Sequence, residues 1–161
     1  MSARDAVLHD IHRTESQSLF QRLIATRRLS SELALPLSDE DQVVQANDDA
    51  SPTKWHLAHT TWFFEAFVLK AFLEGYRIFD ERFEYCFNSY YESVGARQPR
   101  AKRGLLTRPS APEERASADF VDAALERLFD APLKPEAAEL IELGINHEQQ
   151  HQELLLTDIL A

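Results

Sequence analysis

Apolar side chains recur at helical spacing in four stretches of the chain, and proline or glycine separates these stretches. The predicted helices cover residues 4–33, 51–75 and 112–129, and a last segment that follows Pro135. The chain has only four glycines, which argues against many tight hairpins. The pattern therefore predicts an all-α fold, a four-helix bundle with one long crossover loop between the second and third helices.

The ends of the second helix carry ordinary start and stop signals. Ser51 can accept hydrogen bonds from the first free amides of a helix, and Pro52 suits the first helical position. Gly75 suits the residue after a helix end. Residues 76–112 then hold aromatic side chains followed by a basic run, without a sustained period. Loops of this length are uncommon in compact domains and are usually functional.

Composition limits the class of protein. The 161 residues suit one domain, residues 1–161, with a single core. The net charge of -10 disfavours nucleic acid and anionic membrane surfaces as partners. No signal segment or apolar run of membrane-spanning length is evident, and the one cysteine, Cys86, fits a reducing compartment. We expect a cytoplasmic protein.

Three histidines are candidate metal ligands. His147 and His151 are four residues apart in a helical segment, so their imidazoles project from one face and extend its apolar stripe. Burying their nitrogens is costly unless a metal ion or a hydrogen bond satisfies them. His59 lies on the inner face of the second helix, between Trp55 and Trp62. Because bundle cores build metal sites from facing helices, we predict a site made by all three histidines.

The neighbours of this predicted site leave some choices open. His56 is a competing ligand one turn from His59, whereas His9 and His12 are expected to face solvent or make local hydrogen bonds. Gly144 either leaves space beside an ion or allows close helix packing. Three neutral imidazoles suit iron, zinc, nickel or copper and leave coordination positions open.

Residues 147–151 also match the H-E-x-x-H pattern of zinc proteases, in which Glu148 would be the general base. Those enzymes usually take a third ligand from downstream. Only ten residues follow His151, and they offer just Glu153 and Asp158. We therefore disfavour this alternative.

Three ordered motifs resemble a known enzyme family. They are Ser51-Pro52 with Trp55-His56-Leu57-Ala58-His59, then Phe87-Asn88-Ser89-Tyr90-Tyr91, and His147-Glu148-Gln149-Gln150-His151-Gln152-Glu153-Leu154-Leu155. Together they resemble the N-terminal, DinB-like four-helix domain of the ergothioneine-biosynthesis sulfoxide synthases. The resemblance implies a non-haem Fe²⁺ site at His59, His147 and His151. It also implies a reaction that uses O₂ to join the sulfur of cysteine or γ-glutamylcysteine to hercynine.

The resemblance also suggests substrate-binding residues. Gln150 matches a glutamine close to the hercynine site of the family, although an exposed helical glutamine is an equal alternative. Tyr90 and Tyr91 fall where some members place aromatic residues near iron, or they only pack in the core. Arg97, Arg100 and Arg103 either bind substrate carboxylates or form a solvated basic run.

Members of that family continue into a larger C-terminal domain, related to formylglycine-generating enzymes, that is absent from this chain. We therefore expect an isolated domain, a truncated product or half of a split enzyme. Such a chain should be inactive alone in the full reaction. We also expect it to dimerise through an exposed apolar face. Two other functions remain open. One is a free-standing DinB-like, metal-dependent thiol transferase, and the other is a non-enzymatic helical interaction module.

Overall fold

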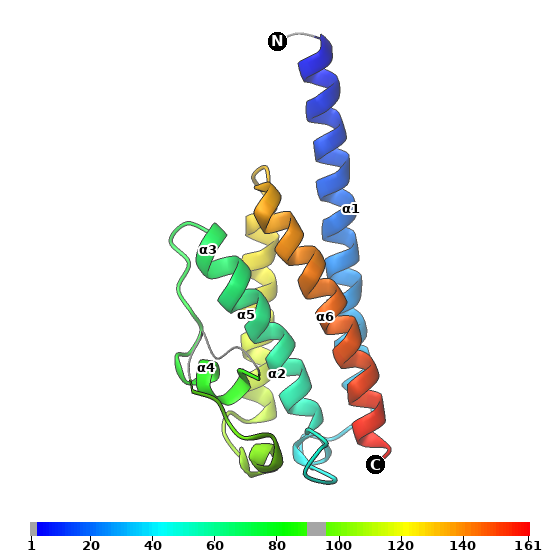
Figure 1. Ribbon diagram of the computed structural model, residues 1–161, viewed down its shortest axis with the longest axis vertical. Coiled ribbons are helices and arrows are strands. Elements are labelled where there is room, and N and C mark those ends of the chain that lie inside the picture. The colour runs from blue at the N-terminus through cyan, green and yellow to red at the C-terminus, as the bar shows by residue number, and fades with distance from the viewer. Residues whose placement is uncertain (1–2, 90–95) are drawn as a thin grey trace.

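Four long helices form a bundle in the computed structural model, which describes residues 3–89 and 96–161, with side chains from residue 14 onward. These helices are α1 (Ala3–Ala34), α2 (Thr53–Phe63), α5 (Ala111–Leu128) and α6 (Pro135–Ile159). Helix α6 packs between α1 and α2, and α2 also contacts α5 (Figure 1). The first part of α1 extends past the ends of the other helices. No strand occurs in the described ranges, so the predicted all-α fold is confirmed.

Helix α2 continues beyond its last α-helical residue. A π-helical turn, η2 (Phe64–Leu69), follows it directly, and a short α3 (Lys70–Phe72) completes the rod. Gly75 then adopts a φ of 71°, a conformation that glycine takes without strain, as expected for the end of this helix. The predicted start was less accurate, because Ser51 caps no helical amide. Its hydroxyl instead accepts a hydrogen bond from Arg103 (2.9 Å).

Helix α5 has the capping box that α2 lacks. The Ser110 hydroxyl accepts a hydrogen bond from the Glu113 amide, and the Glu113 carboxylate accepts one from the Ser110 amide. These reciprocal bonds satisfy amides that the first helical turn leaves free. The helix therefore starts at Ala111, one residue before the predicted start.

The crossover between α3 and α5 is more ordered than its sequence suggested. It contains α4 (Arg82–Phe87) and the 3₁₀ helix η3 (Arg100–Leu105), and a further 3₁₀ turn, η1 (Asp41–Val43), follows α1. Helix α4 packs Phe83 and Phe87 against Trp55 and Trp62 of α2. A six-residue helix is too short to show a hydrophobic period, so the sequence pattern missed it.

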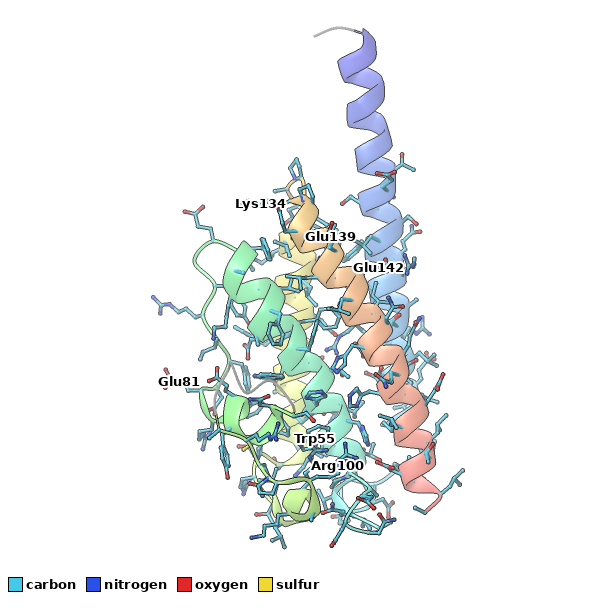
Figure 2. All side chains as sticks on the ribbon, in the orientation of Figure 1. Trp55, Glu81, Arg100, Lys134, Glu139 and Glu142 are labelled. Carbon is cyan, nitrogen blue, oxygen red and sulfur yellow. The ribbon has the colours of Figure 1, made fainter. Side chains whose placement is uncertain are left out.

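Two apolar clusters fill the bundle. The larger one joins α1, α2, η2, α5 and α6 around Phe63 and Phe64, and the smaller one joins α2 to α4. The described side chains extend into the space between the four long helices (Figure 2). None of the described helices combines the length and apolar character needed to cross a membrane.

Gly144 of α6 lies against aromatic side chains of α2 and η2. A Cβ atom at this position would overlap Cε1 of Phe64 and would lie 3.0 Å from Cε1 of Phe63. Such contacts are far shorter than ordinary van der Waals distances. Of the two uses considered for Gly144, the structure therefore favours close helix packing.

Candidate metal centre

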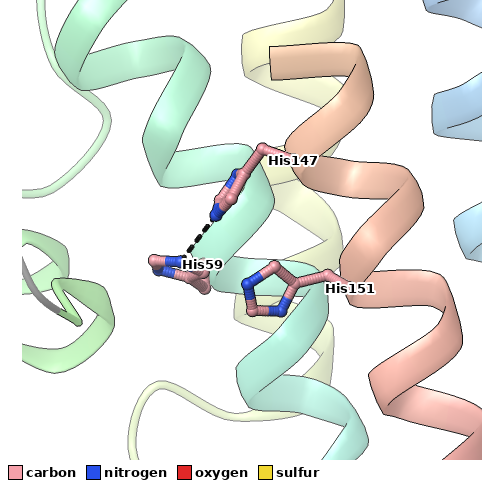
Figure 3. A group of neighbouring side chains, drawn as sticks. All are labelled: His59, His147 and His151. Carbon is pink, nitrogen blue, oxygen red and sulfur yellow. Dashed lines mark hydrogen bonds between the residues drawn. The ribbon is translucent and has the colours of Figure 1, made fainter. Parts of the chain in front are cut away.

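His59, His147 and His151 lie together between α2 and α6. Each offers one ring nitrogen, and these three nitrogens all lie within 4.8 Å of one another. The imidazoles turn toward a common point (Figure 3). His59 is 2% exposed, and the other two are partly buried. The group combines the helical spacing of two residues on α6 with the inner face of α2, as the sequence predicted.

The tautomer of His59 is set by a backbone acceptor. Its Nδ1 lies 2.5 Å from the carbonyl oxygen of Phe87, which can only accept a hydrogen bond. Nδ1 must therefore carry the proton, and the Nε2 lone pair faces His147. This orientation is the one that a metal-binding imidazole with a backbone partner adopts.

His147 brings a second nitrogen to the same point. Its Nε2 lies 3.1 Å from Nε2 of His59. Two neighbouring ligands on an ion with bonds of about 2.1 Å stand about 3.0 Å apart when they meet at a right angle. The buried Nδ1 of His147 has no hydrogen-bond partner among the described residues. The polar interactions of this ring are thus directed at the triad, and the donor set fits a divalent transition metal.

His151 is held from its other side by His56. The two Nδ1 atoms are 2.9 Å apart, and Nε2 of His56 lies 2.9 Å from Oδ2 of Asp158. Nε2 of His151 is left on the side of the ring that faces His59 and His147 (Figure 3). His56 is therefore a neighbour of a candidate ligand, outside the triad itself.

Aromatic rings surround the triad. The indole of Trp55 stacks on His59 with ring centroids 4.6 Å apart, and the ring of Trp62 is stacked with His59 at a centroid distance of 5.8 Å. Phe63 contacts His147. The guanidinium of Arg103 lies 3.3 Å from the centroid of Trp55, a cation–π contact. Aromatic side chains thus line the triad, and the Arg103 guanidinium lies at cation–π distance from the Trp55 ring.

Comparison with known proteins assigns this fold to a family. A family model of the DinB superfamily matches residues 22–155, a range that includes all three histidines. The chain belongs to the DinB superfamily. Domains of this superfamily often bind a divalent metal, and the triad of this DinB domain could hold one. No curated protein matches the chain in sequence.

The zinc-protease alternative conflicts with the position of Glu148. Its carboxylate is fully buried between α6 and α1 of the DinB domain, where it accepts hydrogen bonds from Ser30 (2.6 Å) and Arg27 (3.3 Å). Arg27 also donates to Asp122 and Thr61. A general base must be free to reach the metal-bound water, and this carboxylate is already engaged by Ser30 and Arg27 of α1.

Burial keeps the three histidines neutral. It lowers the pKa of His147 to about 4. Burial, and then the neighbouring histidines, lower the pKa of both His59 and His151 well below the ordinary value. Since a metal ion binds the neutral imidazole, the DinB domain presents its triad in the ligating form at neutral pH.

The predicted substrate residues lie at different depths. Gln150 is exposed on α6. Arg97 is exposed and donates to the carbonyl oxygen of Ser89, and exposed Arg100 donates to that of Asp49. Buried Arg103 instead donates to the Ser51 and Ser89 hydroxyls. Tyr90 and Tyr91 lie outside the described residues.

Sequence reasoning missed two features of this centre. The Arg103–Trp55 stack joins residues far apart in the chain, and nothing in the local pattern of the basic run separates Arg103 from Arg97 or Arg100. The contact of His56 with Asp158 was also missed, although both residues stood on predicted helices. His56 and Asp158 meet only because α2 packs against α6 in the folded structure.

Proposed function

We propose that the DinB domain binds one divalent transition-metal ion through His59, His147 and His151. The observation that carries this proposal is the convergence of three neutral ring nitrogens from two helices within 4.8 Å. Three imidazoles leave coordination positions for other molecules, as in catalytic sites. The site therefore suits chemistry on a small ligand better than a purely structural role.

We further propose that this is the Fe²⁺-binding domain of an ergothioneine-biosynthesis sulfoxide synthase. All three motifs of the resemblance contribute to the triad or its supports. The first contains His59 and Ser51, the third contains His147 and His151, and the carbonyl of Phe87 in the second motif accepts from His59. The substrates would be hercynine, O₂, and cysteine or γ-glutamylcysteine, and a C-terminal domain would complete the substrate pocket.

The residues of this chain would bind and orient the reactants. Iron, when bound, supplies a site where a thiolate, an imidazole and O₂ can meet. Phe87 and His56 hold two of the ligand rings in orientation. Trp55, Trp62 and Phe63 exclude water from one side of the triad. The guanidinium of Arg103, stacked behind Trp55, favours anionic substrates near the site.

A metal-dependent thiol transferase is the second candidate, because the DinB-superfamily match does not distinguish it from the synthase. Such an enzyme would use the same histidines to activate a thiolate without O₂. The two candidates differ in what they bind beside the thiol, since only the synthase needs an imidazole betaine. The non-enzymatic interaction module needs no metal at all.

Electron paramagnetic resonance of the Fe²⁺-loaded chain with nitric oxide, a stand-in for O₂, separates these functions. We expect an iron–nitrosyl signal that hercynine alters and that cysteine or γ-glutamylcysteine alters further, and His59→Ala should abolish it. A signal that responds to thiols and never to hercynine, even when hercynine is in large excess to offset the missing domain, would contradict the synthase and favour the transferase. Failure of the wild-type chain to take up iron would favour the interaction module.

A further inference from the structure

A chain of hydrogen-bonding groups runs from the candidate metal centre to the end of α6. His56 of α2 lies between His151 and Asp158 of α6, at 2.9 Å from each. His56 is 4% exposed, so water does not compete freely for its nitrogens. Oδ2 of Asp158 also accepts a hydrogen bond from the Ser51 amide (2.7 Å), which anchors it to the start of α2.

The chemistry of these groups sets the direction of each hydrogen bond. An ionised carboxylate only accepts, so Nε2 of His56 donates to Asp158. When the His56 ring carries a single proton, on Nε2, its Nδ1 accepts, and the donor that faces it is Nδ1 of His151. With its proton on Nδ1, His151 keeps a lone pair on Nε2, the nitrogen that faces His59 and His147.

The same tautomer results at His59 by a different route. There the backbone carbonyl of Phe87 accepts from Nδ1. At His151 the acceptor is the His56 side chain, which in turn donates a hydrogen bond to the carboxylate of Asp158. Outer partners of this kind orient a ligand and raise its basicity in metalloproteins.

We propose that His56 and Asp158 are positioning residues of the metal centre, which hold His151 with its Nε2 lone pair directed at the ion. The pair also links α2 to the last turns of α6, so it maintains the register of the two helices that supply the ligands. This inference rests on the proposed metal site, but the tautomer it assigns to His151 belongs to the metal-free protein as well.

The test measures Zn²⁺ affinity by competition with a chelator in the full chain. His56→Phe and Asp158→Ala should weaken binding by about 10–100-fold. Asp158→Asn, whose amide oxygen can still accept from His56, should recover a large part of the loss. Glu153→Ala is the matched control, because Glu153 is exposed on the same helix, and it should bind zinc like the wild type.

Histidine ¹⁵N spectra of the metal-free wild type give an independent readout. We expect His151 to be protonated at Nδ1, and His56→Phe to produce a mixture of tautomers. Protonation of His151 at Nε2 in the wild type would overturn the proposal, even if no variant folds. Folded His56→Phe and Asp158→Ala proteins that bind zinc within twofold of the wild type would also overturn it. Absence of zinc binding by the wild type would instead refute the metal site and leave the tautomer measurement standing.

Discussion

Glu148 stands between two candidate ligands in the sequence, and in the structure its side chain contacts α1 instead of joining the triad. Its carboxylate and the guanidinium of Arg27 form a buried ion pair, to which Ser30 adds a hydrogen bond. Burial alone would lower the pKa of Arg27, but Coulombic attraction and hydrogen bonds from Glu148 and Asp122 together raise it. The residue therefore holds α6 on α1, and through α6 it supports the backbone that carries the histidines.

Removal of one partner of this pair should be strongly destabilising. We expect Glu148→Ala to lower the free energy of unfolding by about 3–5 kcal/mol, because it leaves the Arg27 charge buried with less compensation. Glu142 lies on the same helix as Glu148 and forms an exposed ion pair with Arg22 of α1. Glu142→Ala should lower the free energy of unfolding by less than about 1 kcal/mol. Urea denaturation of the metal-free proteins measures both. Equal losses for the two variants would contradict the structural role of Glu148.

Glu114 predicts a pH dependence of stability. Burial raises its pKa to about 7 from an ordinary value near 4.5, so the folded state holds a proton that the unfolded state releases. This contribution is fully present below about pH 4.5 and is lost as the pH rises through 7. Since 1.36 kcal/mol corresponds to one pKa unit, the loss is about 3 kcal/mol.

Glu114→Gln isolates this effect, because the neutral amide does not titrate. The stability of the variant relative to the wild type should therefore increase from pH 4.5 to pH 8, while other titrating groups cancel in the difference. Unfolding in urea at several pH values measures it. A difference that stays constant over this range would show that the folded-state pKa of Glu114 is close to its unfolded value.

At the scale of helices, the close approach of α6 to η2 depends on Gly144. Gly144→Ala should force α6 away from Phe64 and lower the free energy of unfolding by about 1–3 kcal/mol. Because His147 is one turn further along α6, metal affinity should fall as well. Asn146→Ala, at an exposed position on the same helix, is the control. Thermal unfolding and zinc titration test both expectations, and a fully stable Gly144→Ala protein would contradict the packing.

The helices differ in how far sequence alone could predict them. Periodic apolar residues predicted α5 closely, whereas α4 was missed because six residues show no period. The triad was predictable because its residues obey helical spacing and a facing-helix rule. The His56–Asp158 contact was not, because it depends on the angle at which two helices cross. Local sequence carries no signal for that angle.

At the scale of the whole molecule, large apolar side chains remain exposed near the end of α6, among them Leu154, Leu156 and Leu160. The predicted tendency to dimerise would use this surface. Sedimentation velocity should show association that increases with concentration, and the paired substitution Leu156→Glu with Leu160→Glu should reduce it. A monomer at all concentrations would contradict this prediction without affecting the metal site.

The proposed function requires that the DinB domain bind one metal ion through three histidines. The most direct test is the metal content, by mass spectrometry, of the wild type and of His59→Ala, His147→Ala and His151→Ala after anaerobic loading with Fe²⁺ and removal of free metal. We predict close to one iron per wild-type chain and strong loss in each folded variant. Iron retained equally by the three variants, or absent from the wild type, would contradict the claim.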